Sequence, residues 1–332
     1  MNRREFLNGA TLATGAGLLG IRPSVVGAEP PPETKRIRIS RTEGTCVAPE
    51  LVAEDLLRGE GFTEVQYVLR PTGTAFNLLA TGQIDLDAGL AAGQIVRRLD
   101  AGDPVIVLAG IHVGCYELFG STRIHSISDL KGKTVAVPRL ASGHYVILAT
   151  MMAHVGLDPR KDIAVVEIPI GEAGEQLAAG KIDALVAFPP EPQELRAKGI
   201  GHVVVNTILD RPWSQYFCCM LAANKEFARK FPVATKRATR AILKATSICA
   251  LEPERVARLL VDRGYAAHYD YALQTLKDIP YARWREYSPE DTLRFYALRL
   301  REAGVIKSNP QKIIAQGTDW RSLNELKKEL KG

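Results

Sequence analysis

The sequence predicts an α/β protein built from two similar lobes, and three observations support this prediction. The segment Leu79–Asp85 returns 98 positions later as Leu177–Asp183, with leucine, alanine, glycine, isoleucine and aspartate in the same places. The same shift aligns two further pairs of segments: Ile37–Arg41 with Val135–Arg139, and Val65–Val68 with Ile163–Val166. Each repeat alternates expected strands and helices, which is typical of a mainly parallel sheet flanked by helices. A period this long exceeds the roughly 20–50 residues of a solenoid repeat.

Length and composition restrict the class of protein. A chain of 332 residues is long enough for two domains, and 46% hydrophobic with 24% charged residues is typical of a globular protein. No apolar run reaches the roughly 20 residues of a spanning helix. The net charge of +6 is a mild bias over this length, so we expect no nucleic-acid partner.

Residues 1–28 are expected to be a twin-arginine signal peptide. Arg3 and Arg4 precede a weakly hydrophobic segment rich in glycine, alanine and threonine, and Val26–Ala28 offers small residues for cleavage. An ordinary basic amphipathic N-terminus is the alternative. Without a cysteine at the cleavage site, the mature protein should be free in the periplasm.

The order of expected elements predicts that one lobe is inserted into the other. Lobe one should comprise residues 35–120 together with 217–332, and lobe two residues 121–216. The chain should cross between them near Ser121 and Arg211. Each lobe should hold a mixed, mainly parallel sheet flanked by helices, with a cleft between the lobes.

The repeat also indicates which loops face this cleft, because ligands of open α/β sheets bind beyond the carboxyl ends of the strands. Thr45 and Cys46 in one lobe correspond to Gly143 and His144 in the other, and both loops run into helix N-termini that attract anions. Ser142 should help bind the ligand or simply cap the helix. Gly89 and Leu90 follow the third expected strand of lobe one, in another of these loops, and are expected to contact the ligand.

Aromatic residues should cover the apolar part of a ligand. Phe188 and Glu191 lie in a rigid proline-rich loop of lobe two, and Trp213 and Tyr216 lie at the second crossing. A structural turn and hinge packing are the alternatives for these two segments. Two further candidates, Arg41 and Arg139, are equivalent in the repeat and would suit a sulfonate or carboxylate, although surface positions are favoured for both.

The sequence offers little sign of catalysis, a cofactor or a metal. Its six histidines show no i, i+4 pairing, and no Cys-x-x-Cys motif accompanies them, so no metal site is expected. Nucleophile-elbow, Walker and dinucleotide-binding motifs are missing as well. The five cysteines are expected to be buried small hydrophobic residues.

At this point the chain resembles the nitrate/sulfonate/taurine-type substrate-binding proteins of ABC importers. The resemblance rests on the leader, the repeated Gly-x-Ile-Asp, the turn Asp129–Lys133 with Ser142–His144, and the segment Ala223–Phe227 before Phe231-Pro232. It covers nearly the whole mature chain. It implies a two-lobed periplasmic binding fold of type II, a monomer that closes on a small ligand and delivers it to a membrane permease.

A related branch of the same fold makes the thiamine pyrimidine, using a cysteine-rich run just before its Asn-x-Glu-Phe segment. Here that stretch holds only Cys218 and Cys219, placed nearer Asn224 than in that branch. We therefore expect a binding protein rather than an enzyme. No residue selects among sulfonates, nitrate, bicarbonate, pyrimidines and aromatic acids.

Overall fold

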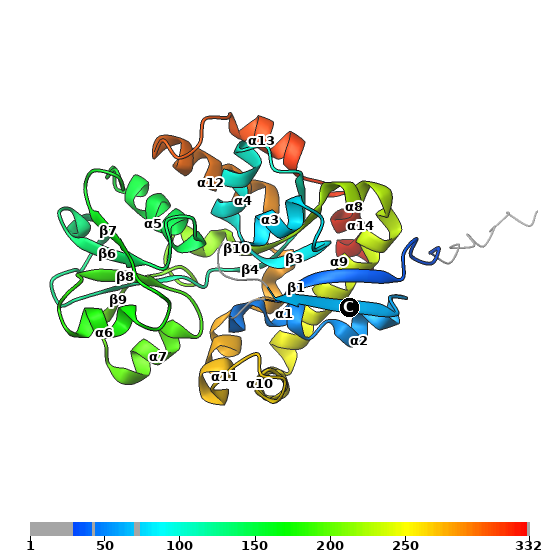
Figure 1. Ribbon diagram of the computed structural model, residues 1–332, viewed down its shortest axis with the longest axis horizontal. Coiled ribbons are helices and arrows are strands. Elements are labelled where there is room, and N and C mark those ends of the chain that lie inside the picture. Colours follow the sequence, from blue (N-terminus) through cyan, green and yellow to red (C-terminus); the bar gives the residue numbers. More distant parts are fainter. Residues whose placement is uncertain (1–28, 42–43, 70–73, 331–332) are drawn as a thin grey trace, which may run out of the picture. The chain divides into compact units, whose positions relative to one another are not determined.

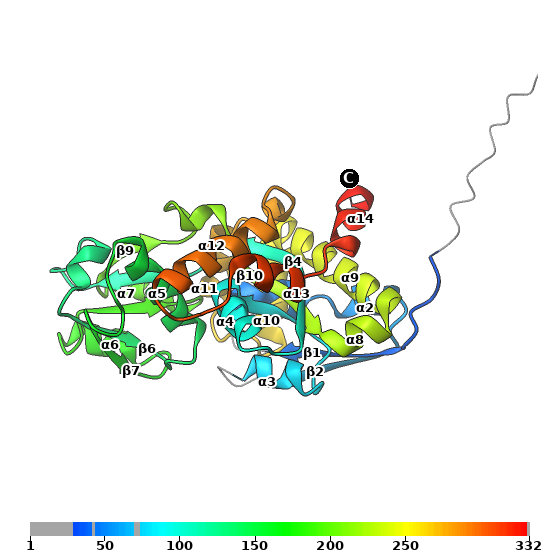
Figure 2. The same ribbon diagram turned by 90° about the horizontal axis from the view of Figure 1, so that it is seen from above.

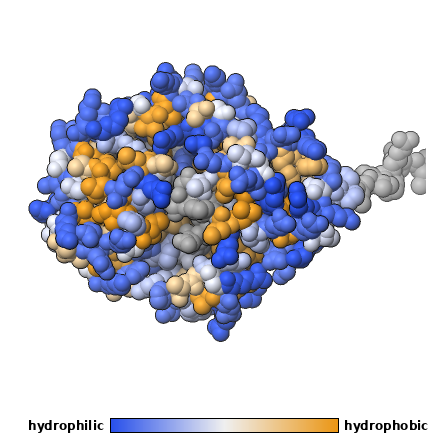
Figure 3. Space-filling view, in the orientation of Figure 1, coloured by the Kyte–Doolittle hydropathy of each residue, from blue (hydrophilic) through white to orange (hydrophobic). Residues whose placement is uncertain are grey.

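The structure is a computed structural model that describes residues 29–41, 44–69 and 74–330. The predicted leader, residues 1–28, lies outside these residues. The chain divides into Met1–Pro30 and one compact unit, Pro31–Gly332, which contains every helix and strand described below. Within the described residues no helix combines the length and hydrophobicity needed to cross a bilayer. The face in Figure 3 is largely hydrophilic, with hydrophobic residues gathered in smaller patches.

The first sheet has five strands in the order β2-β1-β3-β10-β4 (Figure 1). Strand β1 is parallel to β2 and β3, whereas β10 runs antiparallel between β3 and β4. The strands are β1 (Arg36–Arg41), β2 (Glu64–Leu69), β3 (Leu86–Ala91), β4 (Val105–Val113) and β10 (Phe217–Asn224). We call this sheet and the helices packed on it the first lobe. The strand expected to return to it at Phe217 is confirmed as β10.

The second sheet repeats this plan in the order β7-β6-β8-β5-β9. Its strands are β5 (Glu117–Gly120), β6 (Thr134–Val137), β7 (Ala164–Glu167), β8 (Ala184–Ala187) and β9 (His202–Asn206). Here β5 is the antiparallel strand and pairs with β8 and β9. This sheet and its helices form the second lobe, so the two-lobed α/β fold is confirmed.

Strand β5 lies on the other side of the boundary expected from the sequence. Glu117–Gly120 was assigned to lobe one, but its backbone hydrogen bonds belong to the second sheet. The chain therefore leaves the first sheet after Val113 and crosses at residues 114–116. The return crossing lies between Asn206 and Phe217.

Helices cover both sheets. In chain order they are α1 (Ala48–Leu51), α2 (Glu54–Gly59), α3 (Ala75–Ala80), α4 (Ala92–Asp100), α5 (Gly143–His154), α6 (Ala173–Ala178), α7 (Glu191–Lys198), α8 (Lys225–Lys230), α9 (Pro232–Leu251), α10 (Pro253–Asp262), α11 (Tyr269–Asp278), α12 (Pro289–Glu302), α13 (Pro310–Gly317) and α14 (Arg321–Glu329). Helix α12 packs against α4 of the first lobe and α5 of the second, and so bridges them (Figures 1 and 2).

The repeated Gly-x-Ile-Asp has a structural reason. Asp85 accepts a hydrogen bond from the backbone N–H of Arg38 at 2.7 Å, and Asp183 accepts one from the backbone N–H of Thr134 at 3.0 Å. Each aspartate directly precedes one strand, and its carboxylate binds the backbone of the parallel strand beside it. Arginine side chains add an ion pair on each, from Arg38 at 2.6 Å and from Arg123 at 2.7 Å.

This pairing also corrects the alignment of the two repeats. Under the 98-residue shift Thr134 corresponds to Arg36, yet in the sheets it occupies the place of Arg38. The other strands keep the shift, since Leu86 pairs with Ile39 and its equivalent Ala184 pairs with Val135. Strand β6 is therefore displaced by two residues, and Arg41 and Arg139 do not occupy equivalent positions.

Replacing Asp85 by alanine should lower the free energy of unfolding by about 1.5–3 kcal/mol, because a partly buried N–H and the Arg38 guanidinium lose a charged acceptor. Urea unfolding followed by circular dichroism measures this. The control is Glu286→Ala, which breaks the exposed ion pair with Arg283 and should cost less than about 1 kcal/mol. Equal effects of the two variants would contradict the role given to Asp85.

Candidate functional site

Three aromatic rings meet where the two lobes approach each other. Tyr116 lies on the first crossing, His144 on the first turn of α5, and Phe188 on the loop after β8. The ring of His144 stands edge-on to Tyr116, with centroids 5.1 Å apart, and to Phe188, at 5.6 Å. Tyr116 and Phe188 are 6.0 Å apart. We call these three residues the aromatic cluster.

Two glycines allow the lobes to come this close. A Cβ on Gly44 of the first lobe would lie 2.4 Å from the ring of Phe188, and Gly44 has φ +153°. A Cβ on Gly143 would lie 2.5 Å from the hydroxyl oxygen of Tyr116 and 3.0 Å from the Cβ of Ala91. Any larger residue at either position would push the aromatic cluster apart.

Hydrogen bonds between the lobes flank the aromatic cluster. On one side the Arg196 guanidinium of α7 contacts Glu117 within the second lobe and reaches Asp278 of α11 in the first lobe at 2.8 Å, and Gln193 donates to Asp278 at 3.1 Å. On the other side the side chain of Gln94 on α4 donates to the carbonyl of Ala141 at 3.0 Å. The aromatic contacts are therefore held in place by polar bridges around them.

The segment Ser142–His144 combines a cap with a buried ring. Ser142 is the N-cap of α5: its hydroxyl donates to the carbonyl of Arg139 at 2.6 Å and accepts from the N–H of Tyr145 at 3.5 Å. The capping alternative for Ser142 is therefore present in the structure. His144 is buried, and desolvation lowers its pKa to about 3. Its Nε2 makes no hydrogen bond to any described residue, so the imidazole is neutral and has a free polar atom.

On the first lobe, Thr45 and Cys46 form the short 3-10 helix η1 (Thr45–Val47). The Thr45 hydroxyl donates to the hydroxyl of Thr275 at 3.0 Å, and the Cys46 carbonyl accepts from the hydroxyl of Tyr281 at 2.8 Å. Both side chains are buried. These bonds fix the loop against the C-terminal helices.

Gly89 and Leu90 belong to β3. The Gly89 N–H donates to Asp87 at 2.8 Å, and Leu90 is fully buried beside Met220 of β10. Leu90 thus serves the core of the first sheet.

Glu191 begins α7 directly after the cis bond between Pro189 and Pro190. Its carboxylate is buried and accepts a hydrogen bond from the N–H of Gly171 at 3.3 Å. Desolvation raises its pKa to about 7, against the lowering effect of the Gly171 N–H. Glu191 consequently keeps its proton to a higher pH than an exposed glutamate does.

Trp213 and Tyr216 make their ring contacts elsewhere. Trp213 is buried with its ring edge-on to His154 at 5.3 Å, and Tyr216 stacks on Phe295 of α12 at 4.0 Å. These contacts correspond to the hinge-packing alternative. Arg139 is exposed, and so is Arg41, whose guanidinium lies 5.0 Å from the ring centre of Tyr265.

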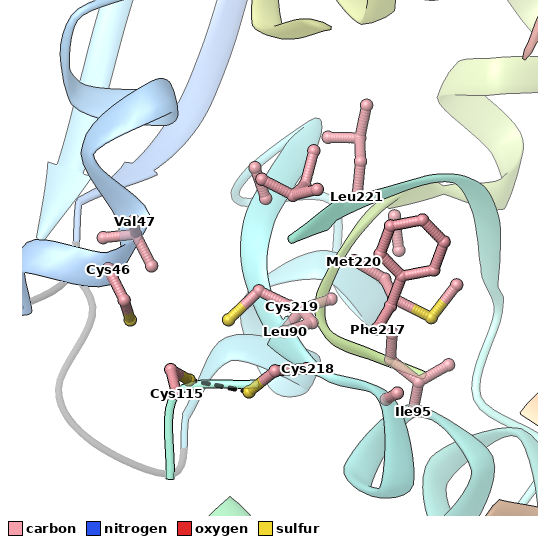
Figure 4. Packing of buried hydrophobic residues seen from close by; sticks show 14 of the residues in the cluster. Cys46, Val47, Leu90, Ile95, Cys115, Phe217, Cys218, Cys219, Met220 and Leu221 are labelled. Atoms are coloured by element: carbon pink, nitrogen blue, oxygen red, sulfur yellow. Dashed lines mark hydrogen bonds between the residues drawn. The ribbon is translucent and has the colours of Figure 1, made fainter. Parts of the chain in front are cut away.

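Sequence reasoning missed Tyr116, whose ring contacts both His144 and Phe188. It also missed that Cys46 lies in a group of ligating side chains with His112, Cys115 and Cys219. All five cysteines are buried, as expected, and they are free. Four of them lie near the crossings (Figure 4). These residues are distant in sequence, so only the insertion of the second lobe, which sets two crossings side by side, could have suggested their meeting.

Comparisons with known proteins agree with this architecture. The model of the NMT1-like family matches residues 32–261. A Brachyspira hyodysenteriae protein, described as a candidate ABC transporter periplasmic binding protein, is 28% identical over 126 residues, which cover 38% of this chain and 34% of that protein. The chain thus aligns with about a third of that relative.

Two solved structures share the fold. The periplasmic nitrate-binding protein NrtA from Synechocystis PCC 6803 superposes with a TM-score of 0.75 and 15% identity, covering 90% of each chain. The alkanesulfonate-binding protein SsuA from Xanthomonas axonopodis pv. citri, bound to MOPS, gives 0.70 and 18% identity, covering 87% of this chain and 99% of that one. At these identities the two matches confirm the two-lobed fold expected from the sequence.

Glu191 makes stability depend on pH. Because its folded pKa is raised from 4.5 to about 7, the folded state binds more protons than the unfolded state between these values. The stabilisation that protonated Glu191 contributes to the folded state is thus fully present below about pH 4.5 and is lost as the pH rises through 7. Glu191→Gln should abolish this loss and exceed the parent in stability above pH 7, by up to about 3 kcal/mol.

Denaturant unfolding at a series of pH values between 4.5 and 8 measures the effect. The matched control is Glu175→Gln on α6, an exposed position that should leave the pH profile unchanged. A Glu191→Gln profile parallel to that of the parent would show that Glu191 stays ionised in the folded protein.

Proposed function

Because the chain belongs to the NMT1-like family, we propose that it is the solute-binding component of an ABC importer, which captures a small ligand between its lobes in the periplasm. One observation supports this most directly: the aromatic cluster and the two glycines bring loops from both lobes into contact beyond the carboxyl ends of the strands. A binding protein that closes on its ligand needs this arrangement.

The ligand would be enclosed when the lobes close around the two crossings. Residues 114–116 and the segment between Asn206 and Phe217 connect the sheets, so rotation about them opens and closes the gap. The Arg196–Asp278 bridge and the Gln94 hydrogen bond span the lobes and would form only in the closed state. Closure would then present one surface made from both lobes to a permease in the inner membrane.

The described side chains favour a small anionic or aromatic, sulfonate-like ligand held by uncharged groups. His144 is neutral and supplies a free ring nitrogen, and Phe188 and Tyr116 supply aromatic surface. The positive end of the α5 dipole, at Gly143, would attract the acidic group of the ligand at roughly 0.3–1 kcal/mol. The other residues of the polar loops, Thr45, Cys46, Gly89 and Ser142, would position the backbone around it.

We propose binding without chemical conversion. The aromatic cluster holds no nucleophile next to a base, and Ser142 is engaged as a helix cap. The ring contacts of Trp213 and Tyr216 are packing at the hinge, and they do not support the pyrimidine-synthase alternative. Incubation with a confirmed ligand should return it unchanged.

Gly143→Val and His144→Ala should weaken ligand binding about 10- to 150-fold, the loss expected for one hydrogen bond of about 1.5–3 kcal/mol to a charged group. The valine would collide with the Tyr116 hydroxyl, and the alanine removes the free ring nitrogen. A thermal-shift screen with nitrate, alkanesulfonates, MOPS and aromatic acids identifies a ligand, and titration calorimetry then gives the affinities.

Gly59→Val is the control, since a Cβ at this position meets no atom within 4 Å. Parent-like affinity of Gly143→Val and His144→Ala, with binding lost in Phe188→Ala, would mean that the ligand is held by its apolar part.

The export route has its own test. If residues 1–28 direct twin-arginine export, replacing Arg3 and Arg4 by lysines should leave precursor in the cytoplasm. Immunoblots of periplasmic and cytoplasmic fractions measure this. A normal periplasmic yield from the double-lysine variant would exclude the twin-arginine route.

A further inference from the structure

The floor of the hinge contains a second group of side chains, separate from the aromatic cluster. Cys46 of η1, His112 of β4, Cys115 of the first crossing and Cys219 of β10 each place one ligating atom within 4.8 Å of the other three. All four residues are buried. Figure 4 shows the sulfur atoms of Cys46, Cys115 and Cys219 turned toward a common space. We call these four residues the thiol cluster.

We propose that the thiol cluster binds a single divalent cation that prefers sulfur and nitrogen ligands, with Zn²⁺ as the expected ion. Three thiolates and one imidazole are a typical donor set of tetrahedral zinc sites. With Zn–S near 2.3 Å and Zn–N near 2.0–2.1 Å, the ligand atoms of such a site are about 3.5–3.8 Å apart. The present spacing, within 4.8 Å, therefore needs a contraction of at most about 1.3 Å.

The orientation of His112 suits a metal ligand. Its Nδ1 faces the carbonyl oxygens of Gly114 at 3.0 Å and Val113 at 3.3 Å, and these two acceptors keep the proton on Nδ1. The lone pair then lies on Nε2, which is buried and makes no hydrogen bond to the described residues. A backbone carbonyl that fixes the tautomer of a ligating imidazole is the usual outer-shell arrangement in metal sites.

Tyr281 supports two members of the thiol cluster. Its hydroxyl donates to the carbonyl of Cys46 at 2.8 Å, and its ring stands edge-on to His112 with centroids 5.4 Å apart. Tyr281 is fully buried, so both contacts are fixed by the core. The site is thus held from the side of the C-terminal helices as well as by β4 and β10.

A fifth residue, Cys218, competes for one ligand. Its Sγ lies 2.7 Å from the Sγ of Cys115, so the two thiols interact directly. A disulfide between them would withdraw Cys115 from the thiol cluster and leave two thiols and an imidazole. Metal binding and this disulfide therefore exclude each other, and an experiment can separate them.

Metal binding would connect three separate parts of the chain. Cys115 lies on the first crossing, Cys219 on the strand that follows the second, and Cys46 on the loop that follows β1. One ion bound to all three would fix the first-lobe loop relative to the hinge. This inference does not depend on the transport proposal.

The test uses the purified chain, reduced and freed of metal by a chelator, and titrated with Co²⁺ and then Zn²⁺. Binding of one Co²⁺ should give thiolate-to-cobalt charge-transfer absorption and the intense visible bands of tetrahedral cobalt, and Zn²⁺ should displace it. Zn²⁺ should also raise the melting temperature of the parent. Elemental analysis after dialysis should give about one zinc per chain.

Cys219→Ser and His112→Gln should each lower the zinc affinity at least about 10-fold and weaken the charge-transfer band. The matched control is Cys249→Ser on α9, a buried cysteine outside the thiol cluster, and it should bind zinc as the parent does. Cys218→Ser removes the competitor for Cys115, so it should bind zinc at least as tightly as the parent. Circular dichroism of each metal-free variant separates loss of a ligand from loss of the fold.

Three results would overturn the proposal. One is failure of the reduced parent to retain zinc after dialysis. Another is unchanged affinity in both Cys219→Ser and His112→Gln while they remain folded. The last is a Cys115–Cys218 disulfide, detected by mass spectrometry, whose reduction gives no metal uptake. Should either ligand variant fail to fold, the cobalt spectrum of the parent alone decides, because a spectrum without thiolate charge transfer excludes the site.

Discussion

The structure depends on the antiparallel pairing of β10 between β3 and β4. The chain leaves the first sheet after β4 and returns to it as β10, so the second lobe is an insertion. Because β10 is the neighbour of β4, the two connections between the lobes lie side by side. The same pairing buries Cys219 and sets it close to Cys115. The hinge is therefore both the axis about which the lobes would move and the place where side chains from distant parts of the sequence meet. The second sheet follows the same rule, with β5 between β8 and β9.

The two-lobed architecture could be predicted from the sequence, but only part of the candidate site could. The spacing between Asp85 and Asp183 correctly indicated two similar lobes, because each aspartate has the same task at the start of a parallel strand. The segments Ser142–His144 and Phe188 were selected for their positions after strands, and the structure brings His144 and Phe188 into contact. Tyr116 could not be selected, because the boundary of the second lobe was placed after β5 and its crossing was not recognised. The thiol cluster could not be predicted for a similar reason. Its four residues come from separate segments, so their spacing in the sequence matches no metal-binding motif.

Burial determines the electrostatics of the region between the lobes. His144 loses its charge and Glu191 moves toward its neutral form, both because the protein surrounds them with little water. The charged groups, such as Arg196 and Asp278, stand farther out and bridge the lobes at their rims. Under the proposed function, these neutral groups would suit a ligand that brings its own charge and pairs it with N–H groups and dipoles. Such an arrangement also avoids the cost of burying an unpaired cation in the empty protein.

The displacement of β6 by two residues has a consequence for how such a molecule can change. Side chains of a strand alternate between the two faces of the sheet, so a slip by one residue would turn every core residue outward, whereas a slip by two restores the same faces. The loops that follow β1 and β6 can therefore differ in length by an even number while the cores of both sheets stay intact. Two halves with a common plan can in this way acquire unlike loops at the same edge of their sheets.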